Sequence, residues 1–180
     1  MLNPFQRGGV ALYLGAKAGW SLANDHMMMG VPRRPVPSFD TPQAAATYYQ
    51  GHGNLYTGDP LYGAADLYTH PNRVQAAIEI GPEQQRRTFI DCDDVAGWYL
   101  TALRGKPGIT ARIVTLVDAH LVGSHVICVG LHNGQPFGLD TNGYRDLPDL
   151  TEATLCKVWS DLYASEGYTY VAALDTPYPF

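Results

Sequence analysis

The stretch that decides the fold runs from residue 88 to residue 105 and reads TFIDCDDVAGWYLTALRG. It predicts a helix that begins at Cys92, because Asp91 is a strong N-cap residue and Arg104-Gly105 supplies a cation and then a stop. Asp93 and Asp94 follow in the first turn, where the positive end of the helix dipole favours anions. Apolar residues recur at helical spacings along the stretch, namely Val95, Ala96, Tyr99, Leu100 and Leu103. The helix is therefore expected to bury one stripe and to hold Cys92 at its N-terminal tip.

A thiol at a helix N-terminus is a candidate nucleophile, because the helix dipole stabilises its thiolate. The three carboxylates that flank Cys92 oppose this effect, so the thiolate needs an imidazolium partner. The alternative is that Cys92 is a small buried apolar residue, which is common for a free cysteine. Cys128 and Cys156 fall inside a predicted strand and a predicted helix, with no base at hand, and are expected to be buried.

Composition restricts the classes of protein. The 180 residues, 46% of them hydrophobic, suit one domain with a real core plus an N-terminal arm. A net charge of -5 argues against a nucleic-acid partner. No apolar run is long enough for a membrane span. Three cysteines imply no disulfide framework and no zinc site.

The N-terminal part of the chain differs from the rest. We expect an arm and linker over residues 1–38 and a separate domain over residues 39–180. The arm contains a predicted helix from Val10 to Met29, and a proline-rich stretch at residues 31–37 then favours extended backbone. Such an arm is expected to dock on a protein partner or a larger assembly.

The remaining patterns mix helices with strands. Helices are expected at residues 41–50, 71–80 and 150–164, and strands at 109–117, 124–131, 137–140 and 168–174. The strand at 124–131 is apolar on both alternations, so we expect it to be covered on both faces. Residues 51–70 are expected to form a long loop.

His125 is the candidate partner of Cys92, and the hairpin that carries it can be worked out. Asn133-Gly134 is a strong turn signal, so residues whose numbers sum to 267 should pair across the two strands. His125 and Asp140 then become diagonal neighbours on one face, close enough for an imidazole to meet a carboxylate. A shift of one residue would separate them.

These three residues form an ordered catalytic set. Cys92 would be the nucleophile, His125 the base that takes its proton and later protonates the leaving group, and Asp140 the group that fixes the imidazole tautomer. The backbone amide of Cys92 is one expected oxyanion donor. Gln84 and Gln85 are candidates for the second donor, of which we choose Gln85.

The motifs at residues 91–96, 106–114, 124–126 and 139–142 resemble the transglutaminase-like superfamily, and most closely the bacterial transglutaminase-like cysteine proteinases. His125 lies 33 residues after Cys92 and Asp140 lies 15 further on, which is similar to the spacing of that family. The resemblance covers about residues 71–176. It implies a papain-like α+β fold in which the cysteine helix packs on an antiparallel sheet, with a Cys-His-Asp triad.

The resemblance also bears on metals. In some relatives that cleave surface adhesins, acidic residues beside the cysteine bind calcium, and Asp91 and Asp93 occupy the matching positions. Helix capping explains the same residues. The hydrolase chemistry requires no cofactor, so calcium at Asp91 and Asp93 is the one candidate ligand besides substrate.

Two classes of function follow. The leading hypothesis is a cysteine hydrolase, a thiol peptidase or amidase that acts on a protein or peptide amide through a thioester acyl-enzyme. A protein-crosslinking transglutaminase would differ in its second nucleophile. The alternative is a virion or assembly protein, plausibly phage-encoded, that uses the same fold as a scaffold. A cytoplasmic or virion-associated location is expected rather than secretion, and the substrate is not identified by the sequence.

Overall fold

The computed structural model describes residues 2–27, 32–52, 67–80, 90–120 and 124–180. These residues form an α+β fold in which five antiparallel strands make one sheet of order β4-β3-β2-β1-β5. The strands are β1 (Ile109–Asp118), β2 (Ser124–His132), β3 (Gln135–Asp140), β4 (Gly143–Asp146) and β5 (Tyr170–Asp175). The helices are α1 (Pro4–Met27), α2 (Pro42–Gly51), α3 (Pro71–Ile80), α5 (Cys92–Leu103), α6 (Glu152–Leu162) and the short 3-10 helix η1 (Ala164–Glu166).

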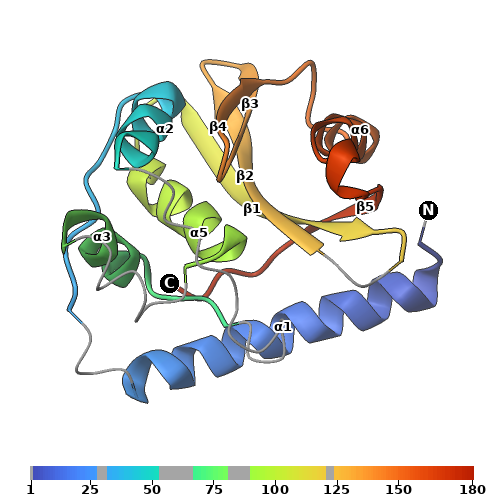
Figure 1. Ribbon diagram of the computed structural model, residues 1–180, viewed down its shortest axis with the longest axis horizontal. Coiled ribbons are helices and arrows are strands. Elements are labelled where there is room, and N and C mark those ends of the chain that lie inside the picture. The colour runs from blue at the N-terminus through green and yellow to red at the C-terminus, as the bar shows by residue number, and fades with distance from the viewer. Residues whose placement is uncertain (1, 28–31, 53–66, 81–89, 121–123) are drawn as a thin grey trace.

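Helices cover both faces of the sheet (Figure 1). On one face α5 packs on β1 and β2, with α2 and α3 beside it, around buried Trp98 and Tyr99. On the other face α6 packs on residues that include Ile127 and Val129, so Leu155 and Trp159 of α6 are buried there. This confirms that the second strand is covered on both faces, and that the cysteine helix lies on an antiparallel sheet.

The hairpin of β2 and β3 has the predicted register. Cys128 pairs with Leu139 and His132 pairs with Gln135, and both pairs sum to 267. Asn133 and Gly134 have φ angles of 51° and 82°, as a tight two-residue hairpin turn requires. The turn therefore places the start of β2 next to the end of β3.

The cysteine helix begins and ends where the sequence predicts. The Asp91 side chain accepts the amide protons of Asp93 and Asp94, while Asp94 accepts the amide proton of Asp91, which completes a capping box. Helix α5 ends at Leu103, and Gly105 follows with a φ of 73°. The cap fixes the orientation of the first turn and hence of Cys92.

The N-terminal helix starts earlier than Val10. Asn3 accepts the amide proton of Gln6 and donates its own to the Gln6 side chain, and Pro4 stands at the first helical position. The apolar pattern does not show this start, because its signal lies in the cap. The predicted end at Met29 lies outside the described residues.

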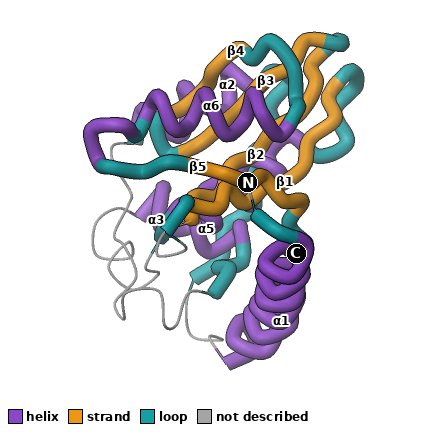
Figure 2. Tube along the Cα trace, turned by 90° about the vertical axis from the view of Figure 1, so that its right-hand side faces the viewer, coloured by secondary structure: helices purple, strands orange, loops and turns teal. Residues whose placement is uncertain are grey.

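Helix α1 packs on its own chain along one side of the molecule (Figure 2). Leu14 is buried, the Ser21 hydroxyl accepts the Tyr68 amide proton at 2.9 Å, and Asp25 accepts from Arg73 at 2.8 Å. The expected arm is thus anchored against residues 39–180 by its inward face. Docking on a partner remains a prediction.

The other elements differ from prediction by a few residues. Helix α2 ends at Gly51, α3 matches at Pro71–Ile80, and α6 is shorter than predicted because Thr151 caps it. Strand β4 was not predicted. Most of the expected loop at 51–70 lies outside the described residues. None of the helices in the described ranges is both long enough and apolar enough to cross a membrane.

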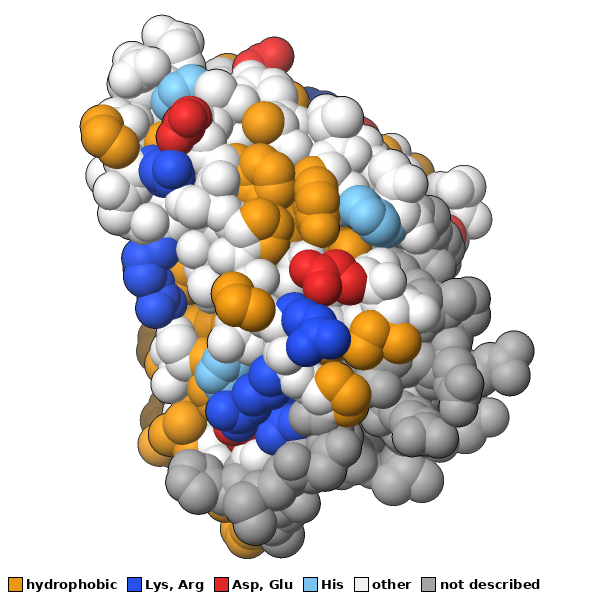
Figure 3. Space-filling model, turned by 90° about the vertical axis from the view of Figure 1, so that its left-hand side faces the viewer, with side chains coloured by type: hydrophobic (Ala, Val, Ile, Leu, Met, Phe, Trp, Pro, Cys, Tyr) orange, Lys and Arg blue, Asp and Glu red, His pale blue; other side chains and the backbone are white. Residues whose placement is uncertain are grey.

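Basic side chains gather on the face shown in Figure 3, beside hydrophobic ones. The linker pair Arg33 and Arg34 does not form an unbalanced positive patch, because Arg33 pairs with Asp25 and Arg34 lies 3.5 Å from Glu79. That nucleic acid is not a partner stays a prediction.

Candidate active site

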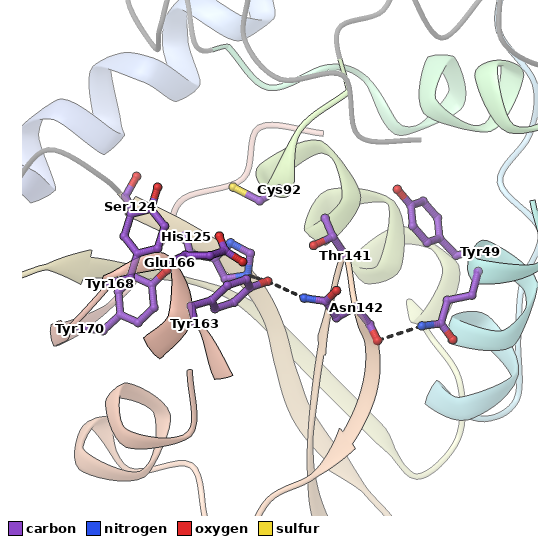
Figure 4. A pocket seen from close by; sticks show the side chains of 11 residues that line it. Tyr49, Cys92, Ser124, His125, Thr141, Asn142, Tyr163, Glu166, Tyr168 and Tyr170 are labelled. Carbon is purple, nitrogen blue, oxygen red and sulfur yellow. Dashed lines mark hydrogen bonds between the residues drawn. The ribbon is translucent and has the colours of Figure 1, made fainter. Parts of the chain in front are cut away.

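A pocket of about 540 Å³ lies where the tip of α5 meets the start of β2 (Figure 4). The end of α2, the β3–β4 turn, the end of α6, η1 and the start of β5 complete its described walls. The lining residues are Tyr49, Gln50, Cys92, Ser124, His125, Thr141, Asn142, Tyr163, Glu166, Tyr168 and Tyr170. Two of the three predicted catalytic residues, Cys92 and His125, thus share one cavity.

Cys92 is the first residue of α5 and is partly exposed. In Figure 4 its side chain extends from the helix tip into the pocket, on the side where His125 lies. Cys128 and Cys156 are buried, and burial raises the pKa of their thiols to about 12 and about 11. Cys92 is therefore the one cysteine of this chain that lines the pocket.

His125 stands near the start of β2 and is largely buried. Its Nε2 lies 3.3 Å from Oδ2 of Asp140, as the predicted hairpin register requires. The Tyr163 ring packs edge-on against the imidazole at a centroid distance of 4.9 Å, and the Tyr163 hydroxyl lies 3.4 Å from the same Nε2. The imidazole is thus held in one orientation by a carboxylate and an aromatic ring.

Asp140 is fully buried behind His125. Oδ2 accepts from Trp159 Nε1 at 2.9 Å and from the Tyr163 hydroxyl at 3.2 Å, and Oδ1 accepts the Asn142 amide proton at 2.8 Å. Burial by itself would raise the pKa of the carboxyl, but the hydrogen bonds from His125 and Trp159 outweigh it and hold this pKa below its ordinary value. Asp140 is therefore ionised at neutral pH.

The sequence did not reveal Trp159 and Tyr163 as site residues. Trp159 belongs to an apolar stripe, and its role follows from α6 packing over β3. Tyr163 accepts from Asn142 Nδ2 at 2.8 Å, while burial and then the Asp140 carboxylate raise its pKa, so its hydroxyl stays protonated and donates. The one available signal was that a buried indole N–H needs an acceptor.

The carboxylates of Asp91, Asp93 and Asp94 form a buried cluster whose oxygens lie within 4.8 Å of one another. Lys17 from α1 pairs with Asp93, and both side chains are almost completely buried. Burial first, and then the neighbouring Asp93, raise the pKa of Asp91 and of Asp94. Helix capping, the Thr69 amide proton donated to Asp94 and the ion pair with Lys17 thus engage all three carboxylates.

Calcium at Asp91 and Asp93 stays a prediction. Calcium takes six to eight oxygen ligands, whereas this cluster offers three side chains, two of them engaged by backbone amides and the third by an ammonium group. The arrangement favours a structural role for the cluster.

The predicted oxyanion donor Gln85, like Gln84, lies outside the described residues. The described pocket contains another side-chain amide, Gln50, whose Nε2 donates to the Asn142 carbonyl at 2.8 Å. This contact braces the β3–β4 turn that holds Asn142 beside Tyr163. Gln50 was not predicted as a site residue.

Comparison with known proteins yields no relative: no family model, no curated protein and no solved structure matches this chain. The resemblance carried by the motifs around Cys92, His125 and Asp140 therefore remains a prediction. What the chain does has to be inferred from the geometry of its side chains.

Proposed function

We propose that this protein is a cysteine hydrolase that cleaves amide bonds, as a peptidase or amidase, through a thioester acyl-enzyme. The observation that carries the proposal is that Cys92 and His125 line one pocket, while buried Asp140 holds Nε2 of His125 at 3.3 Å. A nucleophile, a base and a group that orients the base are the parts that such chemistry needs.

The proposed reaction starts with the imidazole. Because Nε2–H of His125 is donated to Asp140, Nδ1 is the nitrogen that takes the proton of the Cys92 thiol. The thiolate attacks the amide carbon, and the tetrahedral intermediate collapses as Nδ1–H protonates the leaving amine. Water, deprotonated by His125, then attacks the thioester and releases the carboxylic acid and the free thiol.

The surroundings of Asp140 support the base. An ionised carboxylate next to Nε2 stabilises the imidazolium that forms when the thiol gives up its proton. Trp159, Tyr163 and the Asn142 amide fix that carboxylate, so its charge stays directed at His125. The N-terminal end of α5 favours the thiolate, and the Cys92 amide at the first helical position is the proposed oxyanion donor.

The resemblance to the transglutaminase-like superfamily supports the same assignment. It implies a cysteine helix packed on an antiparallel sheet, and α5, β2 and β3 stand in that relation here. A papain/transglutaminase-like fold is accordingly part of the proposal. A crosslinking transglutaminase would use the same acyl-enzyme and release it to an amine.

An activated ester tests the acyl-transfer step without knowledge of the substrate. With p-nitrophenyl acetate we expect a burst of p-nitrophenolate and an acetyl group on Cys92, which peptide mass spectrometry locates and neutral hydroxylamine removes, as expected for a thioester. His125→Ala should abolish the burst, and Cys92→Ser should lose the labelled peptide. Acetylation of Cys92 no faster than that of Cys128 would contradict the proposal.

A second candidate function, an assembly protein, is favoured by the outward face of α1. Phe5, Leu12 and Trp20 on this face are 92%, 78% and 68% exposed. From Gly8 to Ala23, the residues of α1 that the structure shows as exposed are all apolar or glycine. An apolar surface of this kind is typical of a protein contact. A monomer with a reactive Cys92 would favour the hydrolase, and an assembled protein with an inert Cys92 would favour the scaffold.

A further inference from the structure

An aromatic wall leads from the proposed base to the mouth of the pocket. Tyr170 packs against His125 with ring centroids 6.4 Å apart, and Tyr168 stacks parallel to Tyr170 at 6.1 Å, with an interplanar angle of 5°. Tyr168 is 39% exposed, so part of this wall faces solvent. Figure 4 shows both tyrosines on the same side of the pocket as His125. The proposed triad of Cys92, His125 and Asp140 gives these two tyrosines no role.

Among the described residues that line the pocket there is an acidic side chain but no lysine or arginine. Glu166 is exposed at the end of η1 and lines the pocket, whereas the described lining contains neither lysine nor arginine. The remaining polar groups on this lining are neutral amides and hydroxyls, apart from Cys92 and His125. Behind the histidine, Asp140 adds a second negative charge, which is buried and lies 4.0 Å from the Arg145 guanidinium.

We propose that the pocket selects amide substrates with a cationic group near the scissile bond, such as a lysine or arginine side chain or a free ammonium. The cation lies against the exposed ring of Tyr168, which Tyr170 supports from behind, and is neutralised by the Glu166 carboxylate. This specificity rests on the proposed function, because the cation is placed relative to Cys92 and His125.

Physical chemistry favours a cation over the other occupants. Aromatic faces attract ammonium and guanidinium groups through the ring quadrupole. An anionic substrate would meet Glu166 and Asp140, and a purely apolar one would remove water from Glu166 without giving it a partner. The ring contacts and the carboxylate together should favour a cation by about tenfold, since each contributes roughly two- to fivefold at a partly exposed site.

Charged thiol reagents measure this preference without a known substrate. Three methanethiosulfonates with trimethylammonioethyl, methyl and sulfonatoethyl groups present the same reacting sulfur. In each case the Cys92 thiolate attacks that sulfur, a mixed disulfide forms and methanesulfinate leaves. Rates at Cys92, read by mass spectrometry and divided by the rates with the uncharged thiol 2-mercaptoethanol, give the selectivity of the pocket.

We expect the cationic reagent to exceed the anionic one by about tenfold after this correction. Glu166→Gln and Tyr168→Leu should each remove a large part of the preference. Asp161→Asn is the matched control, because it removes a negative charge from the exposed end of α6 outside the pocket lining, and it should leave the ratio unchanged.

The outcomes separate the two proposals. Rapid, His125-dependent reaction of Cys92 with no preference for the cation would overturn the cationic specificity and leave the hydrolase intact. An equal loss of preference in Asp161→Asn and Glu166→Gln would assign the effect to net charge and also overturn the specificity. Slow reaction with all three reagents, unaffected by His125→Ala, would overturn both proposals.

Discussion

Asp140 is the residue on which the proposed site depends most, because a buried carboxylate needs partners to stay charged. Its hydrogen bonds hold its pKa below the ordinary value, so the ionised form stabilises the fold. A carboxyl whose pKa is lower in the folded state contributes stability above its unfolded pKa of about 3.9, and this contribution is lost as the pH falls through the folded pKa.

Trp159→Phe tests this, since it removes the N–H that bonds Asp140 and leaves a smaller aromatic ring in its place. We expect the free energy of unfolding in urea to fall by about 1.5–3 kcal/mol at pH 7, as for a hydrogen bond to a charged group. The loss should shrink as the pH falls through the lowered folded pKa of Asp140, where this carboxylate takes up a proton.

Trp98→Phe is the matched control for that variant, because Trp98 Nε1 donates to the neutral Gln75 side chain at 2.8 Å. Its loss should be about 0.5–1.5 kcal/mol and should not depend on pH. Equal losses with the same pH profile in both variants would contradict the account of Asp140.

At the scale of the element, the carboxylates that cap α5 lower the stability of the fold at neutral pH. The pKa values of Asp91 and Asp94 are raised, so the folded state binds more protons than the unfolded chain above pH 4. The effect of pH on stability has the opposite sign to that of Asp140, because stability is lost as the pH rises through these raised pKa values.

Asp94→Asn should therefore stabilise the protein at pH 8, by on the order of 1 kcal/mol, with the gain vanishing near pH 4. The amide keeps an oxygen for the Thr69 N–H, gives up the longer 3.4 Å contact with the Asp91 N–H, and removes one buried charge. Asp118→Asn should have the opposite effect, because the backbone amides of Thr169, His120 and Ala119 hold the Asp118 pKa down against burial. Thermal unfolding of both variants at pH 4 and pH 8 measures these effects. A lower stability of Asp94→Asn than of the parent protein at pH 8 would contradict this account.

The ion pair between α1 and α5 is the second prediction at this scale. Lys17→Met should lower the free energy of unfolding by about 3–5 kcal/mol, because it leaves the buried Asp93 without its cation. Adding Asp93→Asn should restore much of the loss, since the two residues act as a pair. Urea unfolding of the single and double variants gives the coupling free energy between Lys17 and Asp93. If the losses of the two single variants simply add up in the double variant, the ion pair does not anchor α1.

Local signals predicted the hairpin and the cysteine helix well. Asn133-Gly134 sets the register through backbone geometry, and Asp91 sets the start of α5 through its cap. Trp159 and Tyr163 could not be predicted, because they reach Asp140 only when α6 folds over β3. The anchoring of α1 by Lys17 was missed for the same reason, since its partner lies 76 residues further along the chain.

At the scale of the whole molecule, the proposed site joins two layers that lie on opposite faces of one sheet. Helix α5 supplies Cys92 from one face, and α6 supplies Trp159 and its C-cap residue Tyr163 from the other. Gly138 in β3 makes the second layer possible, because a Cβ there would collide with the Trp159 ring and lie 3.3 Å from Leu147 Cδ1.

Gly138→Ala should therefore disturb stability and site together. We expect a loss of about 1–3 kcal/mol in unfolding free energy and slower alkylation of Cys92, as Trp159 moves away from Asp140. Gly15→Ala is the control, because nothing lies near a Cβ at that position of α1, and it should stabilise the helix by up to about 1 kcal/mol. An unchanged Cys92 rate in a destabilised Gly138→Ala would contradict the link between the layers.

The most direct test of the central claim is the rate at which iodoacetamide alkylates each cysteine between pH 4 and pH 9. The proposed thiolate-imidazolium pair predicts that at pH 6 Cys92 reacts at least about tenfold faster than Cys128 and Cys156, and that His125→Ala removes this advantage. If Cys92 reacts no faster than the two buried cysteines, or equally fast without His125, the pair does not exist and the chain is not a cysteine hydrolase of this kind.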